Sequence, residues 1–237
     1  MNLIVTAAIY KGDDAAQNGH RTLRLEIPNG GPKPKPVPLF LLPSFAAGDT
    51  CVAGVFEPGT NLLVNGKLYP SKEDGRMYVV PTQPLQSVSK VTQINQVFLS
   101  GGVGFIGEQY RDNVFNFGLM CQASPQKTLG HTWNDSLGFR IESWEDDAKR
   151  MQKYLYVGRQ ISLGGSLRFD SWVSKDGDQK AQYKVRIRGS QYAFFGKSKK
   201  EPDNVITTQE PSRFESPHQQ AIAQTVEQPK LDDGIPF

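Results

Sequence analysis

Short runs rich in β-forming residues and bounded by turn residues dominate the chain up to about residue 195. Alternation with a period of two is typical of strands that bury one face, and regularly spaced short strands predict a barrel or a sandwich. The first half has such runs at 3–10, 22–27, 37–42, 61–68 and 77–80. The second half has them at 93–99, 114–122, 138–144, 160–169 and 182–188. The pattern therefore predicts an all-β body.

One stretch has clear helical periodicity. In residues 145–156, Ala148 and Met151 recur at helical spacing, and Gly158 follows as a stop signal. Residues 45–56 contain glycines and no regular period, which predicts a short or irregular helix there.

An internal repeat divides this body. The run GTNLLVNGKL at 59–68 matches GRQISLGGSL at 158–167, with both glycines of each run in the same places. Each copy is followed by an Asp-Gly pair, a sequence that closes two strands through a tight turn. These pairs are Asp74-Gly75 and Asp176-Gly177. The same supersecondary unit is therefore expected twice.

The repeat also fixes the expected domain organisation. Residues 2–6 and 95–99 are suitable first strands of the two copies, so the join is expected at 84–90. Five strands with a helix between the third and fourth is the layout of the oligonucleotide-binding (OB) fold, a Greek-key barrel. We predict two tandem five-stranded OB-fold barrels followed by a disordered tail, at residues 1–89, 90–197 and 198–237.

Charge is segregated along the chain although the net charge is only +3. Residues 91–200 carry 16 Lys and Arg against 10 Asp and Glu, whereas residues 201–237 carry 2 against 7. A basic middle beside an acidic end predicts a body that binds a polyanion and a tail that competes for that body. The tail is rich in Gln, Pro and Ser and has too few apolar groups to offset its ordering entropy. Its apolar C-terminal tip predicts a segment that binds partner proteins.

Several other classes of function are not indicated. No apolar run reaches the ~18 residues of a membrane span, so we expect a soluble cytoplasmic protein. Cys51 and Cys121 are far apart and the three histidines are scattered, so no disulfide, metal site, cofactor or catalytic group is expected. We interpret residues 145–147 as acidic residues that complement a helix dipole, and residues 101–105 as a turn after a strand.

Two motifs carry a resemblance to a known family. Residues 154–168, read with Trp172 and Asp176-Gly177, resemble the strand-four and strand-five hairpin of bacterial single-stranded DNA-binding proteins. The run DDGIPF at 232–237 is similar to the acidic C-terminal tip of that family, with Gly234 where a third acidic residue is common. The resemblance covers roughly the last 145 residues, and the first barrel joins it only through the internal repeat.

The resemblance implies stacking positions for bases. Trp172 matches the family's hairpin tryptophan, and Trp144 matches an aromatic position at the end of strand three. Gly138 stands where the family often has another tryptophan, so that stacking position is either absent or supplied by Phe139 or Trp133. Independently, the chain's three tryptophans all fall in the second barrel, and any base can stack on an aromatic ring.

Basic residues of the second barrel, a few residues of the first barrel and the C-terminal tip complete the expected contacts. Cations for the phosphates are expected at Arg140, Arg168, Lys180, Lys184, Arg186 and Arg188, and the last three alternate along one strand and so share a face. Possible contacts in the first barrel are Tyr69, Lys72, Arg76 and Tyr78. Partner proteins are expected to bind Asp232, Asp233, Ile235, Pro236 and Phe237.

The function expected is sequence-independent binding of single-stranded DNA by a non-enzymatic, nucleoid-associated protein of replication, recombination and repair. The family commonly works with four barrels, so two barrels per chain imply a homodimer. One alternative is an interaction and assembly protein in which only the second barrel binds DNA. Another is an OB-bearing enzyme of nucleic-acid metabolism, such as a nuclease or a ligase.

Overall fold

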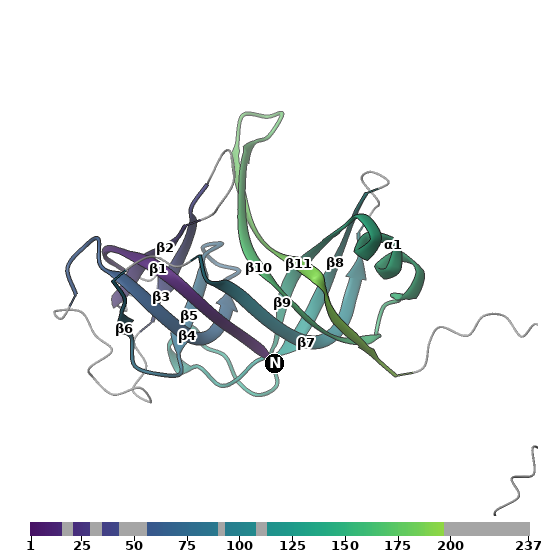
Figure 1. The fold of residues 1–237 in the computed structure, drawn as a ribbon, viewed down its shortest axis with the longest axis horizontal. Helices are drawn as coiled ribbons and strands as arrows, with labels where there is room; N and C mark the ends of the chain where they lie inside the picture. The colour runs from purple at the N-terminus through teal and green to yellow at the C-terminus, as the bar shows by residue number, and fades with distance from the viewer. Residues whose placement is uncertain (16–20, 29–34, 43–55, 90–92, 108–112, 197–237) are drawn as a thin grey trace, which may run out of the picture. The chain divides into compact units, whose positions relative to one another are not determined.

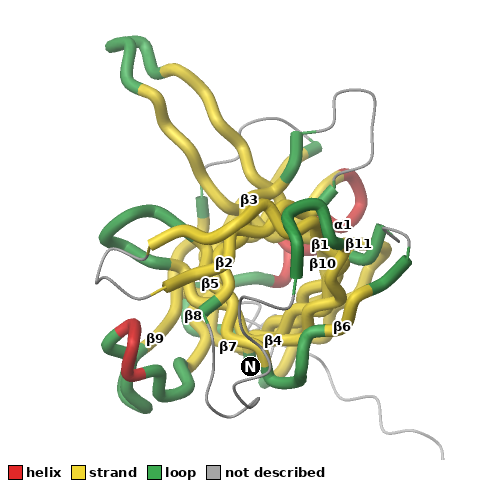
Figure 2. Tube along the Cα trace, turned by 90° about the vertical axis from the view of Figure 1, so that its left-hand side faces the viewer, coloured by secondary structure: helices red, strands yellow, loops and turns green. Residues whose placement is uncertain are grey.

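The computed structural model describes residues 1–15, 21–28, 35–42, 56–89, 93–107 and 113–196. These residues fall in one compact unit, Met1–Lys199. Strands make up most of it (Figures 1 and 2). The elements of the first half are β1 (Asn2–Ala15), β2 (Arg21–Ile27), β3 (Val37–Leu41), β4 (Asn61–Pro70), β5 (Met77–Pro81) and β6 (Gln86–Ser87). Those of the second half are β7 (Asn95–Ile106), β8 (Val114–Gln122), η3 (Lys127–Leu129), β9 (Ser136–Trp144), α1 (Glu145–Tyr154), β10 (Gln160–Val173) and β11 (Gln179–Phe195).

Each half closes on itself as a five-stranded barrel. In the first, β1 pairs with β2 and β4, β2 with β3, β4 with β5, and a short parallel contact between β3 and β5 completes the circle. In the second, β7, β8 and β9 form a meander, β10 pairs with β11 and β7, and a parallel contact between β9 and β11 completes the circle. The order of strands is the same in both. The prediction of two OB-fold barrels is confirmed.

The first strands of the two barrels pair with each other. β1 and β7 run antiparallel, with Asn2 opposite Leu99 and Thr6 opposite Asn95. In the repeat, residues 2–6 and 95–99 are copies of one another, so the pairing is nearly symmetric about its centre. Asn2 and Asn95 also make equivalent buried hydrogen bonds, in which each side-chain amide donates to a backbone carbonyl of the repeat strand, Leu68 or Leu167.

The positions of the internal repeat require glycine for the same structural reasons in both barrels. Gly59 and Gly158 adopt left-handed φ angles of 97° and 92°, which only glycine adopts without strain. Gly66 and Gly165 lie against a backbone carbonyl of the following strand, and a Cβ at either position would clash with it. The repeat detected in the sequence is therefore a repeat of backbone geometry.

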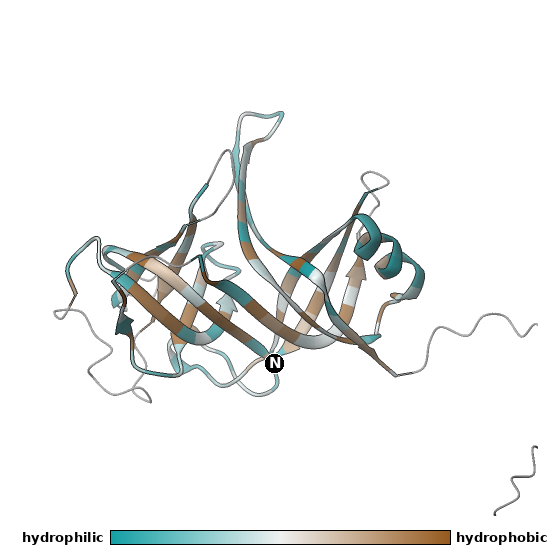
Figure 3. Cartoon of the chain, in the orientation of Figure 1, coloured by the Kyte–Doolittle hydropathy of each residue, from teal (hydrophilic) through white to brown (hydrophobic). Residues whose placement is uncertain are grey.

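The core follows from the alternation of apolar residues along the strands. β2 shows the burial pattern expected for a strand with one inner face, with Leu23, Leu25 and Ile27 at most 1% exposed. In the second barrel, Ala148 and Met151 of α1 are buried against the barrel, as the helical periodicity predicts. The rest of α1 is hydrophilic, as the teal colour shows in Figure 3.

The structure bears on the expectations for residues 101–105 and for the helices. The interpretation of residues 101–105 as a turn was wrong, because β7 runs through them to Ile106 and its glycines allow close packing against β8. The helix expected at 45–56 lies almost wholly outside the described residues, as does the tail at 198–237. In the second barrel, α1 occupies the predicted place between the third and fourth strands.

Candidate nucleic-acid interface

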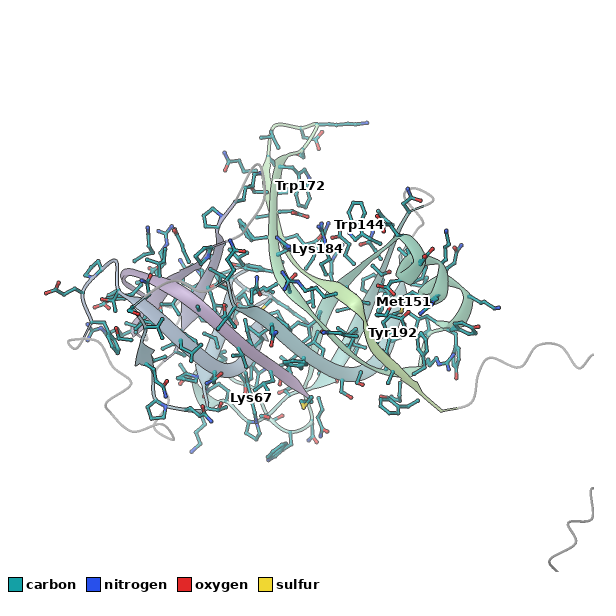
Figure 4. The ribbon with its side chains drawn as sticks, in the orientation of Figure 1. Lys67, Trp144, Met151, Trp172, Lys184 and Tyr192 are labelled. Atoms are coloured by element: carbon teal, nitrogen blue, oxygen red, sulfur yellow. The ribbon has the colours of Figure 1, made fainter. Side chains whose placement is uncertain are left out.

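A groove of about 650 Å³ opens on the second barrel. One side is the projecting β10–β11 hairpin, which we call the arm, and the other side is formed by the ends of β8 and β9. Figure 4 shows Trp172 on the arm, Trp144 across from it, and Lys184 between them. The lining residues are Phe105, Gly107, Val114, Asn116, Phe117, Arg140, Glu142, Trp144, Asp170, Trp172, Gln182 and Lys184.

Trp144 is placed by the junction between β9 and α1. It is the last residue of β9 and caps the start of α1, and 42% of its surface is exposed. The guanidinium of Arg186 lies 4.9 Å from the centre of its ring, an arrangement that fixes the ring and puts positive charge beside it. The residue therefore presents an aromatic surface to the groove.

Trp172 is placed by the arm. Here β10 extends beyond the barrel, paired with β11 as far as Val173 opposite Gln179. Trp172 pairs with Lys180 and is 46% exposed, so an aromatic ring and a cation share one rung of the arm. A tryptophan this exposed is not a core residue.

Phe105 is a third aromatic residue in the groove, and the sequence interpretation missed it. Its ring is 45% exposed and lies directly over Gly118 of β8, where any Cβ would clash with the ring. The guanidinium of Arg140 lies 6.0 Å from the ring centre. Strand alternation along β7 would place Phe105 on the same inner face as Val103, but a register shift between these two residues leaves the ring exposed instead, so the local pattern gave no signal for it.

Lys184 of β11 lines the groove, and Arg186 lies two residues further along the same strand. Lys184 and Arg186 alternate with the buried residues Val185 and Ile187, so the predicted alternation is present. Glu142 of β9 is only 6% exposed and holds both cations, with Oε2 2.8 Å from Arg186 Nε and Oε1 3.8 Å from Lys184 Nζ. Lys184 also lies 2.9 Å from Asp170. These carboxylates preorganise the cations.

Arg168 lies next to this row, opposite Lys184 in the pairing of β10 and β11. Burial lowers the pKa of Arg168, and the nearby charges of Arg186 and Arg188 lower it further. Like charges gathered this closely repel one another, and a bound anion would relieve that repulsion. Burial is the larger cause of the lowered pKa of Arg168, and the carboxylates of Glu142 and Asp170 partly offset the effect of the two arginines.

Other expected contacts of the second barrel lie elsewhere. Trp133 is 64% exposed but sits between η3 and β9, away from the residues that line the groove. Phe139 is 3% exposed because it alternates with Gly138 and Arg140 and so points inward, and we withdraw it as a stacking residue. Arg188 is exposed on β11, beyond the groove lining.

The first barrel has no equivalent aromatic surface at the residues expected there. Tyr69 and Tyr78 are each 2% exposed, so neither ring is available for stacking. The Tyr78 hydroxyl donates to Asp74 at 2.6 Å, and burial together with that carboxylate raises the pKa of Tyr78 to about 12. Arg76 forms ion pairs with Asp14 and Asp74. Lys72 is exposed.

The remaining expectations concern metals, membranes and the tail. Within the described ranges, no group of three or more His, Cys, Asp or Glu residues is arranged to hold a metal ion. Among those same residues, no helix has the length and apolar character that crossing a membrane requires. Cys121 is buried, which raises its pKa to about 11. Asp232, Asp233, Ile235, Pro236 and Phe237 lie outside the described residues, as does Cys51.

Barrel closure and groove together define a tandem OB-fold protein whose second barrel carries an aromatic and basic groove. Residues 94–195 match the model of the single-strand binding protein family. This part of the chain is similar to that family, and the resemblance identified from the sequence is confirmed.

Solved structures with the same fold extend over both barrels. The wild-type single-stranded DNA binding protein from Thermus aquaticus is 15% identical, with a TM-score of 0.54, over 86% of this chain and 97% of that one. A deletion mutant of the Thermus protein has 15% identity and a TM-score of 0.55, over 86% of this chain and 98% of that one. At this identity the similarity establishes the shared fold. No curated protein matches the chain.

Proposed function

We propose that the second barrel binds single-stranded DNA without regard to base sequence. The observation that carries this proposal is the pair of exposed tryptophans, Trp144 and Trp172, on opposite sides of a groove floored by Lys184. Bases stack on aromatic faces whatever their identity, and cations between the rings track the phosphates. The match of residues 94–195 to the single-strand binding protein family supports the same function.

The proposed contact residues are those that the groove and its continuation along β11 supply. Phe105, Trp144 and Trp172 are assigned to stacking. Trp133, which is exposed outside the groove, is assigned to an outlying contact with the strand. Phosphate contacts are assigned to Arg140, Arg168, Lys180, Lys184, Arg186 and Arg188.

The first barrel has a different role in this proposal. Its candidate aromatic residues Tyr69 and Tyr78 are buried, which favours a barrel that organises the assembly rather than one that stacks bases. We propose domains at residues 1–89, 90–197 and 198–237, and a homodimer that brings four barrels together. Sedimentation equilibrium at micromolar concentration tests the dimer: twice the chain mass supports it, and a monomer or a tetramer contradicts it.

The cellular role proposed is protection of single strands in replication, recombination and repair in the cytoplasm, with the tail recruiting partner proteins. The tail's acidic character and its Ile235-Pro236-Phe237 tip suit an apolar pocket with a basic rim. Deleting residues 230–237 is expected to abolish capture of partners from a bacterial lysate and to preserve DNA binding. Loss of DNA binding with partners retained would reverse this division of roles.

Titration of tryptophan fluorescence tests DNA binding directly. Oligo(dT) is expected to quench the emission because bases stack on Trp144 and Trp172, and duplex DNA of the same length is expected to bind far more weakly. Oligo(dA) serves as the control for base preference. Equal affinity for the duplex and the single strand would remove stacking from the mechanism.

A further inference from the structure

A second hollow, of about 380 Å³, lies where the two barrels meet. Its first-barrel side is the β4–β5 turn, from Pro70 to Met77, and its second-barrel side is formed by β9, β10 and β11. It shares Arg140, Gln182 and Lys184 with the groove described above, so the two hollows are adjacent. We call this second hollow the junction passage.

The charge of the junction passage differs from that of the groove. Four cations line it, Lys72, Arg76, Arg140 and Lys184, and no Asp or Glu is among its lining residues. The groove has Arg140 and Lys184 together with Glu142 and Asp170. Positive charge without a carboxylate in the lining is suited to a phosphate backbone, which supplies the anions itself.

The two sides of the passage are held together by direct contacts. The Tyr183 hydroxyl donates to the Pro38 carbonyl at 2.9 Å, and burial raises the pKa of Tyr183, so the hydroxyl keeps its proton. Lys67 Nζ donates to Ser124 Oγ at 2.7 Å, and the Tyr69 ring stacks on His131 with 5.6 Å between ring centres. With the pairing of β1 and β7, these contacts make the passage a fixed feature of the surface.

Lys72 is the first-barrel cation most available to a ligand here. Arg76 is engaged by Asp14 and Asp74, at 3.4 and 3.6 Å, and its guanidinium lies over the Phe40 ring. Lys72 is exposed and forms no ion pair with any residue that the structure describes. It also lines a further hollow whose other charged residues are Glu73, Asp74, Lys127 and Asp135, and Asp135 lies close enough to interact with its charge.

We propose that a single strand leaving the second-barrel groove runs through the junction passage and that Lys72 binds one of its phosphates. This inference rests on the proposed function, since it extends the same strand beyond the groove. The first barrel then contributes a phosphate contact at its hairpin edge without a stacking surface of its own. Specificity for strand length, rather than for sequence, would follow from such a contact.

The test is a length series of oligo(dT), from about 5 to about 30 nucleotides, because one OB-fold barrel occupies about 4 to 16 nucleotides. Affinity is measured by tryptophan quenching at several salt concentrations for the wild type, Lys72→Ala and Lys72→Arg. Lys149→Ala is the matched control, because Lys149 is an exposed lysine on α1 that lines none of these hollows.

For Lys72→Ala, the shortest oligonucleotides are expected to bind as they do to the wild type. Beyond the length that reaches the passage, affinity is expected to fall and the salt slope to become shallower by about 0.7, the value for one single-strand phosphate contact. Lys72→Arg is expected to restore the slope, and Lys149→Ala to leave it unchanged.

Three results would overturn the proposal: an unchanged slope at every length for Lys72→Ala, an equal loss at every length, or the same length-dependent loss in Lys149→Ala. Failure of the proposed function looks different, because the wild type would then quench with no oligonucleotide of any length.

Discussion

The two barrels place equivalent residues in equivalent backbone positions and then use their surfaces differently. Asn2 and Asn95 donate equivalent hydrogen bonds to the equivalent strands β4 and β10, and Gly66 and Gly165 allow the same close approach of the following strand. The aromatic residues near the repeat hairpins diverge: Tyr78 is buried, whereas Trp172 is 46% exposed on an arm that extends beyond the barrel. A conserved frame within one chain therefore does not carry a binding surface with it, because the surface depends on outward-facing residues and on hairpin length.

The largest expected effect is a loss of stability when a buried aromatic ring of the first barrel is truncated. Tyr78→Ala removes an aromatic side chain that packs against Phe40 and is expected to lower the free energy of unfolding by about 3–5 kcal/mol. Urea denaturation measures the loss, and binding of a short oligo(dT) by the folded fraction should be unchanged. A stable variant with weakened binding would place Tyr78 in the interface instead.

The opposite result is expected for the arm of the second barrel. Trp172→Ala should weaken binding of any single strand by about 1–3 kcal/mol, with similar losses for oligo(dT) and oligo(dA). The melting temperature should stay the same, because the ring lies outside the core. Phe195→Ala is the control, since that aromatic side chain is 50% exposed and lines none of the hollows. A lowered melting temperature with unchanged affinity would assign Trp172 to the core.

A smaller effect is expected from a single cation of the groove. Arg140→Ala should make the slope of log K against log salt shallower by about 0.7, because one phosphate contact is lost. Lys11→Ala in the first barrel is the control, since Lys11 pairs with Glu26 and lies outside all three hollows. Equal slopes for both variants would remove Arg140 from the phosphate path.

Local sequence patterns predicted many of the strands and turns of both barrels. Strand alternation and the Gly59 and Gly158 motifs are local signals, and the structure has the strands and turns where they indicated. Phe139 was misassigned although its neighbours Gly138 and Arg140 face outward, so alternation alone already indicated an inward ring. The burial of Tyr69 and the exposure of Phe105 depend on contacts with His131 and Gly118, far along the chain, and such contacts have no local signature.

The smallest expected effect concerns acid stability and again contrasts the two hairpins. Burial raises the pKa of Asp74, but hydrogen bonds from the Tyr78 hydroxyl and the Arg76 amide outweigh it, and the net pKa lies below the ordinary value of 3.8. A carboxyl with a lowered folded pKa contributes stability above its unfolded pKa, and that contribution is lost as pH falls through the folded pKa. Asp74→Asn should therefore flatten the fall in stability below about pH 4. Thermal melts between about pH 7 and pH 2 measure it, with Asp176→Asn at the exposed turn of the arm as the matched control. If both variants changed the acid limb equally, the carboxyl of the first hairpin would have no special role, and the two hairpins would differ only in their aromatic residues.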